Sequence, residues 1–161
     1  LGDPGYMPMI GHVNGGYVIH TDFREGNAAP ASKNLEFIKT CVAQLPIGTT
    51  FDRFRADSAS YQAEIFNYCD KENILFSVSG QKDSSVIYEI ENIKEDDWEV
   101  LNPKEQIAEF MHTMGEADNA FRMIVVKKDI TPTLPGLDEY LSKETKEQLH
   151  KEMYYTVATN D

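Results

Sequence analysis

The sequence predicts one α/β domain, or one such domain with a sizeable insertion, on three observations. Two strand patterns flank Asn14-Gly15 near the start of the chain, and an amphipathic helical pattern follows them. A strand, a helix and a second strand then occur within about 30 residues, which favours a right-handed parallel crossover. The expected fold is therefore a mixed sheet that combines an antiparallel hairpin with a parallel βαβ unit.

The hairpin is predicted from residues 6–13 and 16–23, which both read as strands. The dipeptide between them, Asn14-Gly15, is the preferred sequence of a two-residue type I′ turn. A loop of small residues follows from Arg24 to Ser32. Beyond it, apolar residues recur at helical spacing until Pro46 ends the run, at Leu35, Ile38, Val42 and Leu45.

The βαβ unit is predicted from the next segment. Residues 51–56 and 74–79 read as its two strands, and the helix between them carries an apolar stripe. We expect Ser58 or Ser60 to cap that helix, because a serine hydroxyl accepts hydrogen bonds from free N–H groups at a helix start. Together with the hairpin, this unit places an α/β layer in the first 80 residues.

The character of the sequence changes after Gln81. The remaining expectations are a helix over 87–94, a strand over 107–114 with Ala108, Phe110, His112 and Met114 on one face, a strand over 121–126, a loop over 131–136, partial helix over 137–152 and a strand over 154–159. Trp98 follows an acidic run, and we interpret it as a packing residue.

The composition and net charge argue against several classes of function. The chain of 161 residues is 41% apolar, and its 27 acidic against 15 basic residues give a net charge of −12. Such a charge argues against a surface that grips DNA phosphates. We find no apolar run of about 18 residues and no signal-peptide pattern at Leu1, so we expect a cytoplasmic protein without a membrane span. Cys41 and Cys69 lack partners at metal-ligand spacing and are interpreted as buried thiols.

Four short motifs carry a family resemblance. They are Gly5-Tyr6-x-Pro8, Phe23-Arg24-x-Gly26-Asn27, Arg55-Ala56-Asp57-Ser58-x-x-Tyr61 and Val157-Ala158-Thr159-Asn160. In this order they resemble the catalytic core of bacterial insertion-sequence DDE transposases (DDE transposase group 1), and the resemblance covers most of the chain. The third motif is the most specific of the four.

The resemblance implies an RNase H-like fold and a DNA recombination enzyme. Members of that family use two Asp and one Glu to hold two divalent ions, Mg²⁺ or Mn²⁺, for cleavage and strand transfer at transposon ends. The implied division is a partial catalytic core over 1–80, an insertion subdomain over 81–150 and a returning core strand over 151–161. The protein would act on transposon-end and target DNA in the bacterial cytoplasm.

Asp57 matches the second carboxylate of that family. The first Asp and the Glu have no match here: Asp3 lies in a turn-like Asp-Pro-Gly sequence, and neither Glu152 nor Asp161 lies on a helix after the last strand. The sequence therefore resembles the middle of a transposase. We expect the chain alone to be inactive and to hold no metal tightly.

Each candidate residue also has a plainer interpretation. Asp57 could be a carboxylate at a helix start, favoured by the helix dipole. Arg24 and Asn27 could contact DNA or support the site, or could only stabilise a loop in which Gly26 is left-handed. Arg55, Ser58 and Tyr61 are further candidates for DNA contact or site support. For Arg55, as for Arg53, an ion pair is the favoured role.

Two other functions stay open. One is a non-catalytic protein-interaction domain of RNase H-like fold, which the net charge of −12 suits. The other is a metal-dependent nuclease of the same fold, which needs the same carboxylates. In the fold that the resemblance implies, the strand of the first Asp lies between the hairpin and the strand of Asp57. We therefore expect unpaired strand edges that join each other or a second copy in a homodimer.

Overall fold

The computed structural model describes residues 5–131, 141–142, 145 and 151–161. Its strands and helices are β1 (Tyr6–Val13), β2 (Tyr17–Glu25), α1 (Asn34–Ala43), β3 (Arg53–Ala56), α2 (Ala63–Lys71), β4 (Leu75–Ser79), α3 (Ser84–Glu91), β5 (Glu99–Asn102), β6 (Glu105–His112), β7 (Phe121–Asp129) and β8 (Glu152–Thr159). Short 3-10 turns lie at Ser58–Ser60 and Glu95–Asp97.

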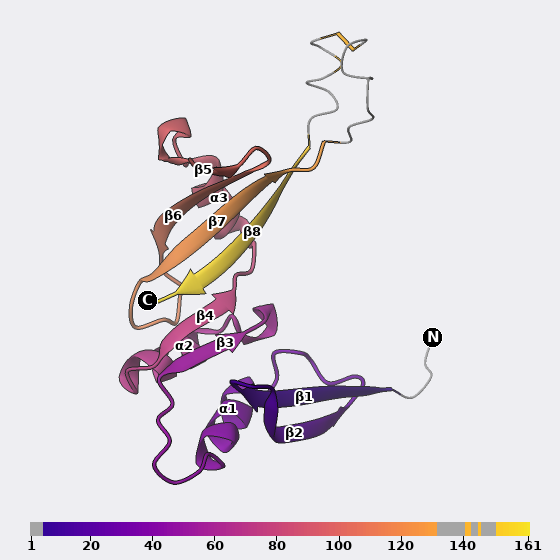
Figure 1. Cartoon of the computed structure of the whole chain (residues 1–161), viewed down its shortest axis with the longest axis vertical. Helices are drawn as coiled ribbons and strands as arrows, with labels where there is room; N and C mark the ends of the chain where they lie inside the picture. Colours follow the sequence, from indigo (N-terminus) through magenta and orange to yellow (C-terminus); the bar gives the residue numbers. More distant parts are fainter. Residues whose placement is uncertain (1–4, 132–140, 143–144, 146–150) are drawn as a thin grey trace.

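These strands form two sheets (Figure 1). β1 and β2 make an antiparallel pair, and the larger sheet has the order β3-β4-β8-β7-β6-β5. β3 and β4 run parallel, whereas the other neighbours in the larger sheet are antiparallel. The mixed α/β fold, the hairpin and the parallel βαβ unit predicted from the sequence are confirmed.

The turn of the hairpin differs from the prediction. The connection holds three residues, because Val13 pairs with Tyr17. Positive φ angles occur at Gly15 and Gly16 and not at Asn14, and Gly16 N–H donates to Val13 O at 3.1 Å. A type I′ turn needs positive φ at both of its central residues. The second glycine removes that need, since it can supply the left-handed conformation at no steric cost.

α1 packs against one face of the β1–β2 hairpin, the face on which Gly11 lies. The closest approach is at Gly11, where an added Cβ would lie against the Cys41 sulfur, with the Phe37 ring beside it. The hairpin therefore takes its orientation from α1. Among the described strands it does not pair with β3, so the first expected pairing, of these edges with each other, is wrong, whereas pairing with a second copy stays a prediction.

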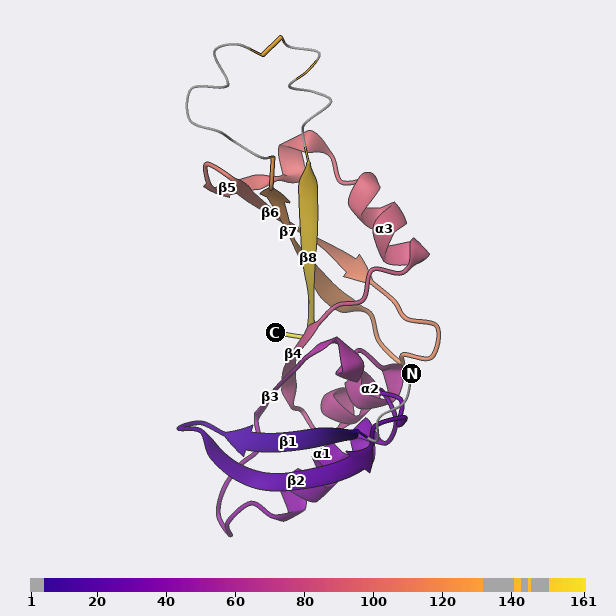
Figure 2. The ribbon, with the colours of Figure 1, turned by 90° about the vertical axis from the view of Figure 1, so that its right-hand side faces the viewer.

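The core lies on one face of the larger sheet. Figure 2 shows α2 and α3 on the same side of that sheet. Every strand residue of the buried cluster points to that side: Phe76, Val78, Phe121, Met123, Val125 and Ala158. The strand predicted over 107–114 is β6, which begins earlier and ends at His112. Three of the four residues predicted on one face, Ala108, Phe110 and His112, stand opposite Val125, Met123 and Phe121. Met114 lies beyond the end of the strand and still packs against the core.

The second half of the chain extends the sheet of the first half. β8 lies between β4 and β7, so the sheet runs without a break across the expected boundaries at 80 and 150. The helix expected over 87–94 begins earlier, at Ser84, because Asp83 caps it. β5 was not expected. Most of the loop and helix expected over 131–152, and Asp3, lie outside the described residues.

Candidate functional site

Asp57 lies at the carboxyl end of β3, where open α/β sheets place their ligands. Its side chain is exposed, and Oδ1 accepts a hydrogen bond from Ala59 N–H at 3.0 Å. The carboxylate therefore caps the 3-10 turn over Ser58–Ser60. Oδ2 accepts no hydrogen bond from the described residues.

The expected serine caps are wrong. Asp57 rather than Ser58 caps the short turn, and α2 begins later, at Ala63, after an extended Gln62 whose side chain does not cap it. The Gln62 amide instead donates to Ala59 O at 2.6 Å and to Ala31 O at 3.0 Å. The sequence pattern missed the 3-10 turn because one such turn carries no apolar period.

Two other side chains hold the turn after Asp57. Asn34, buried at the start of α1, donates to Ala59 O at 2.9 Å. Gln81, which follows β4, donates to Ser58 O at 2.9 Å. The turn is thus tied to both the helix before β3 and the loop after β4. Sequence reasoning missed both residues, because a lone amide carries no local signal of a contact so distant along the chain.

A second aspartate lies at the same edge of the sheet. Asp83 follows the end of β4, and its Oδ1 accepts hydrogen bonds from the N–H groups of Ser85 and Val86, both at 2.9 Å. Each of two neighbouring parallel strands is thus followed by a capping carboxylate. Asp83 could have been found from the sequence, because an Asp directly before a helical apolar pattern predicts an N-cap.

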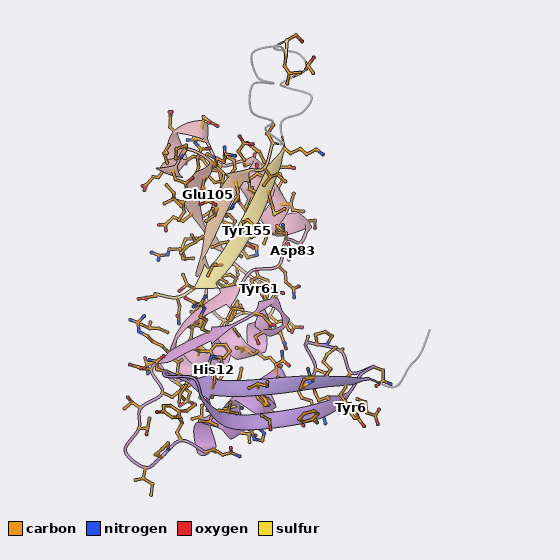
Figure 3. All side chains as sticks on the ribbon, turned by 45° about the vertical axis from the view of Figure 1, so that its right-hand side comes forward. Tyr6, His12, Tyr61, Asp83, Glu105 and Tyr155 are labelled. Atoms are coloured by element: carbon orange, nitrogen blue, oxygen red, sulfur yellow. The ribbon has the colours of Figure 1, made fainter. Side chains whose placement is uncertain are left out.

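Tyr61 is a core residue. Its side chain is 7% exposed and makes edge-to-face contacts with Phe66 at 5.5 Å and Phe121 at 6.0 Å between ring centroids. Burial, with a smaller contribution from the nearby charge of Asp83, raises the pKa of Tyr61 to about 12 (Figure 3). Its hydroxyl has no hydrogen-bond partner among the described residues. Tyr61 therefore supports the turn by packing.

Arg24 anchors the loop after β2. Its Nη1 donates to Ser32 O at 2.8 Å, beside Ala31, the acceptor for Gln62. Asn27 is exposed and makes no side-chain hydrogen bond to the described residues. Gly26 is not left-handed, contrary to the expectation. It is needed because a Cβ there would lie 2.6 Å from Gly5 O.

The two arginines of β3 point to the sheet face away from the helices, since their cross-strand neighbours are Leu75 and Ser77. Arg53 forms the expected ion pair, with Nη1 3.3 Å from Asp161 Oδ2. Arg55 is exposed and forms no ion pair with the described residues. Arg55 therefore places a positive charge two residues before Asp57 in the sequence.

The last motif, Val157 to Asn160, fastens β8 to β4. The Thr159 hydroxyl donates to Phe76 O at 2.6 Å. The Asn160 side chain accepts from Phe76 N–H at 2.7 Å and donates to Ile74 O at 3.1 Å. An amide side chain thus continues the ladder beyond the last paired residue. Its role is to hold β4, and with it the edge that carries Asp57.

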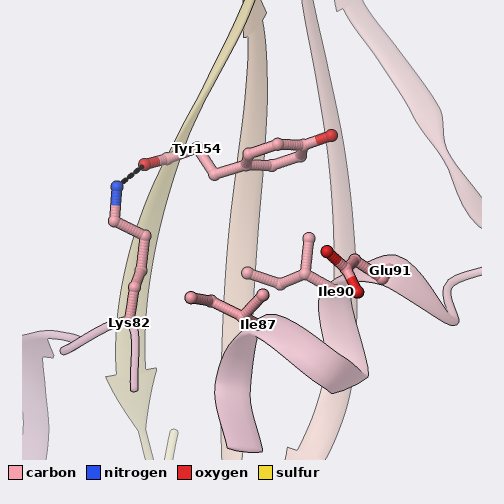
Figure 4. Close-up of a pocket in the computed structure, with 5 residues that line it drawn as sticks. All are labelled: Lys82, Ile87, Ile90, Glu91 and Tyr154. Carbon is pink, nitrogen blue, oxygen red and sulfur yellow. Dashed lines mark hydrogen bonds between the residues drawn. The ribbon is translucent and has the colours of Figure 1, made fainter. Parts of the chain in front are cut away.

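A small cavity lies between α3 and β8 (Figure 4). It measures about 150 Å³ and is lined by Lys82, Ile87, Ile90, Glu91 and Tyr154 (Figure 4). Lys82 donates to the main-chain oxygen of Tyr154 at 2.9 Å. Nearby, Trp98 packs against the core, as expected, with the Lys127 ammonium 4.5 Å from its ring centroid.

The described residues contain no group of three or more His, Cys, Asp or Glu side chains that could hold a metal. A two-metal centre needs several converging carboxylates, and the described residues bring no such group to Asp57. No helix of the described residues is long and apolar enough to cross a membrane. The chain matches no family model and no curated protein sequence.

Proposed function

We propose that this chain is part of the catalytic core of a DDE insertion-sequence transposase with an RNase H-like fold. The supporting observation is the position of Asp57, exposed at the carboxyl end of a strand in a parallel pair. The turn that carries it is held from two sides by Asn34 and Gln81. Such support keeps a carboxylate in a fixed place, as a metal ligand requires.

The proposed chemistry is DNA strand cleavage and strand transfer at transposon ends. Bound Mg²⁺ or Mn²⁺ would stabilise the attacking and leaving oxygens of the phosphodiester. Asp57 would supply one carboxylate for those ions, and Arg55 would attract phosphate from the exposed side of β3. The described residues do not complete such a site, so we expect this chain alone to be inactive.

The first experiment is to sequence the coding DNA on both sides of this segment. The proposal expects an upstream strand pattern that carries an Asp and a downstream helix pattern that carries a Glu. If the flanking sequence encodes neither, the chain is not part of a three-carboxylate enzyme. That outcome favours the non-catalytic interaction domain, which the net charge of −12 already suits better than a DNA-binding role.

The second experiment assays the complete protein with DNA that carries the transposon ends. We expect Asp57→Asn to abolish Mg²⁺-dependent cleavage, with a loss of more than about 100-fold, and to leave DNA binding intact. Asp83→Asn is the matched control, since Asp83 caps a helix at the neighbouring strand end. Asparagine caps as well as aspartate, so both variants should fold.

The outcomes separate the candidate functions. Equal activity of Asp57→Asn and the unaltered protein removes Asp57 from the catalytic site. Cleavage that depends on Asp57 but shows no preference for transposon ends indicates a nuclease of the same fold rather than a transposase. Loss of activity in Asp83→Asn alone places the reaction at the end of β4, and the proposed assignment of Asp57 is then wrong.

A further inference from the structure

The turn between β1 and β2 carries a chemically labile dipeptide, Asn14-Gly15 (Figure 2 shows the hairpin). Both residues are exposed, and so is Gly16. The asparagine side chain is among the thermally labile groups of proteins. Its amide carbon is attacked most readily by the main-chain nitrogen of the next residue, because that nitrogen can close a small ring with it. The surroundings of the Gly15 nitrogen therefore decide whether Asn14 reacts.

Both reacting groups of this dipeptide are free. The Asn14 side chain makes no hydrogen bond to any described residue. The hydrogen bond that closes the turn comes from Gly16 N–H, which donates to Val13 O at 3.1 Å, whereas Gly15 N–H donates to no main-chain oxygen in the described part of the chain. Gly15 also lacks a Cβ, so its own residue puts no side chain in the path of the Asn14 amide.

Two other asparagines lack a suitable nitrogen after them. Asn27 is exposed like Asn14, but the next nitrogen is engaged, since Ala28 N–H donates to Glu25 O at 2.9 Å. Asn102 is followed by Pro103, which has no N–H group. Neither position offers the free main-chain N–H group that Gly15 offers.

The remaining asparagines are held in place by hydrogen bonds. The side-chain amide donates to another residue at Asn34, Asn67, Asn92, Asn119 and Asn160. At Asn73 the side chain is not held, but the next nitrogen, that of Ile74, donates to Cys69 O at 2.8 Å. Asn14 is also the only asparagine that a glycine follows in the sequence. Sequence and hydrogen bonding thus single out the same residue.

We propose that Asn14 is a site of spontaneous deamidation, with water as the only co-reactant. The Gly15 nitrogen attacks Asn14 Cγ, so a new C–N bond forms and the bond from Cγ to the side-chain nitrogen breaks. The Gly15 nitrogen loses its proton to solvent, and the side-chain nitrogen takes up a proton and leaves as ammonia. The product is a cyclic succinimide. Water then opens either ring C–N bond of the succinimide, which gives aspartate or isoaspartate.

Both products change the hairpin. Each adds a negative charge to a chain whose net charge is −12. Isoaspartate also lengthens the main chain by a carbon between Val13 and Tyr17, which pair with each other across the turn. The reaction involves neither Asp57 nor the turn that carries it, so this inference is independent of the proposed function.

The test is to incubate the folded chain at mildly alkaline pH, digest it at acidic pH and locate the modified residue by mass spectrometry. We expect the mass increase of an amide converted to an acid at Asn14 before any other asparagine. Aspartate and isoaspartate should both form, at a rate comparable with that in a synthetic peptide of residues 12–18. An Asn14 that stays intact while the peptide is converted overturns the proposal. Aspartate without isoaspartate overturns it as well, because direct hydrolysis then replaces the succinimide.

Two variants identify the reacting residue. Asn14→Gln should lose the product, because the longer glutamine side chain has to close a larger and less favourable ring. Asn27→Gln is the matched control, at the other exposed asparagine without a side-chain hydrogen bond, and should react as fast as the unaltered chain. Gly15→Ala is a poorer test, since φ at Gly15 is +88° and an added Cβ would lie 3.0 Å from the Tyr17 ring.

The results of these variants are decisive in either direction. An unchanged rate of deamidation in Asn14→Gln overturns the proposal, and so does a loss of the product in Asn27→Gln. Circular dichroism checks that both variants are folded. The comparison of the unaltered chain with the peptide needs no variant, so it decides if Asn14→Gln does not fold.

Discussion

The side-chain amide of Asn160 donates a hydrogen bond to Asp70 Oδ1 at 2.8 Å and so joins the end of β8 to the last turn of α2. The other carboxylate oxygen, Oδ2, accepts a hydrogen bond from Asn119 at 3.1 Å. Asn160 also pairs with the main chain of β4 on both sides of Leu75. One side chain thus connects three elements of the sheet and its covering layer.

The first prediction concerns this connection. Asn160→Ala should lower the free energy of unfolding by about 2 kcal/mol, because it leaves Phe76 N–H and Ile74 O without their partner in a half-buried place. Asn119→Ala removes only an exposed hydrogen bond to the same carboxylate and should cost about 0.5 kcal/mol or less. Urea denaturation measures both. Equal losses would show that the main-chain contacts of Asn160 contribute nothing.

The second prediction separates capping from catalysis at the two aspartates. Asp83→Ala should destabilise the chain by about 1 kcal/mol, because two N–H groups of α3 lose their acceptor. Asp57→Ala should cost less, about 0.5 kcal/mol, since it frees one N–H group in a short exposed turn. The Asn variants should restore both losses. Thermal unfolding of the four variants tests this order, and a larger loss at Asp57 would contradict it.

The local elements of this fold could be predicted, whereas their assembly could not. The βαβ unit follows from the alternation of strand and helix patterns, and the parallel pairing of β3 and β4 follows because a helix between two strands returns the chain to the end where the first strand began. The place of β8 between β4 and β7 depends on pairings across the length of the chain. No local period records such contacts, and for the same reason the roles of Asn34 and Gln81 were missed.

The candidate site shows the same limit. Asp57 could be selected because it stands where a strand pattern ends, and the structure places it at that position. Tyr61, selected as a candidate from the same motif, is a core residue instead. In the sequence, an aromatic residue two positions before a helix is compatible with a role at the site and with a place in the core. Its contacts with Phe66 and Phe121 show that Tyr61 belongs to the core.

The third prediction concerns alkaline pH. The pKa of Tyr61 is raised from 10.0 to about 12, chiefly by burial and then by the charge of Asp83. The stability that the neutral hydroxyl provides is therefore complete below pH 10 and is lost as the pH rises towards 12. At pH 11 the loss should be about 1 kcal/mol relative to pH 8.

Tyr61→Phe isolates this contribution. The variant removes a buried hydroxyl that has no partner among the described residues, so it should leave stability at pH 8 nearly unchanged or slightly raised. Between pH 8 and pH 11 it should lose about 1 kcal/mol less than the unaltered chain. Cys69, whose burial raises its pKa to about 12, titrates in both proteins and cancels in the comparison. Identical pH profiles in urea denaturation would refute this role for Tyr61.

The fourth prediction concerns Gly80, where the chain leaves β4. A Cβ at this position would lie 2.7 Å from the Thr156 hydroxyl oxygen and 3.0 Å from Thr156 Cβ. Gly80 N–H also donates to Thr156 O at 2.8 Å, so the two strands cannot separate to make room without losing that hydrogen bond. Gly80→Ala should therefore destabilise the chain by about 1–3 kcal/mol.

Gly115→Ala is the control, because an added Cβ there meets nothing within 4 Å. It should be neutral or stabilise by up to about 1 kcal/mol through the unfolded chain. If Gly80→Ala is as stable as Gly115→Ala, the contact between β4 and β8 at Thr156 is looser than the structure shows.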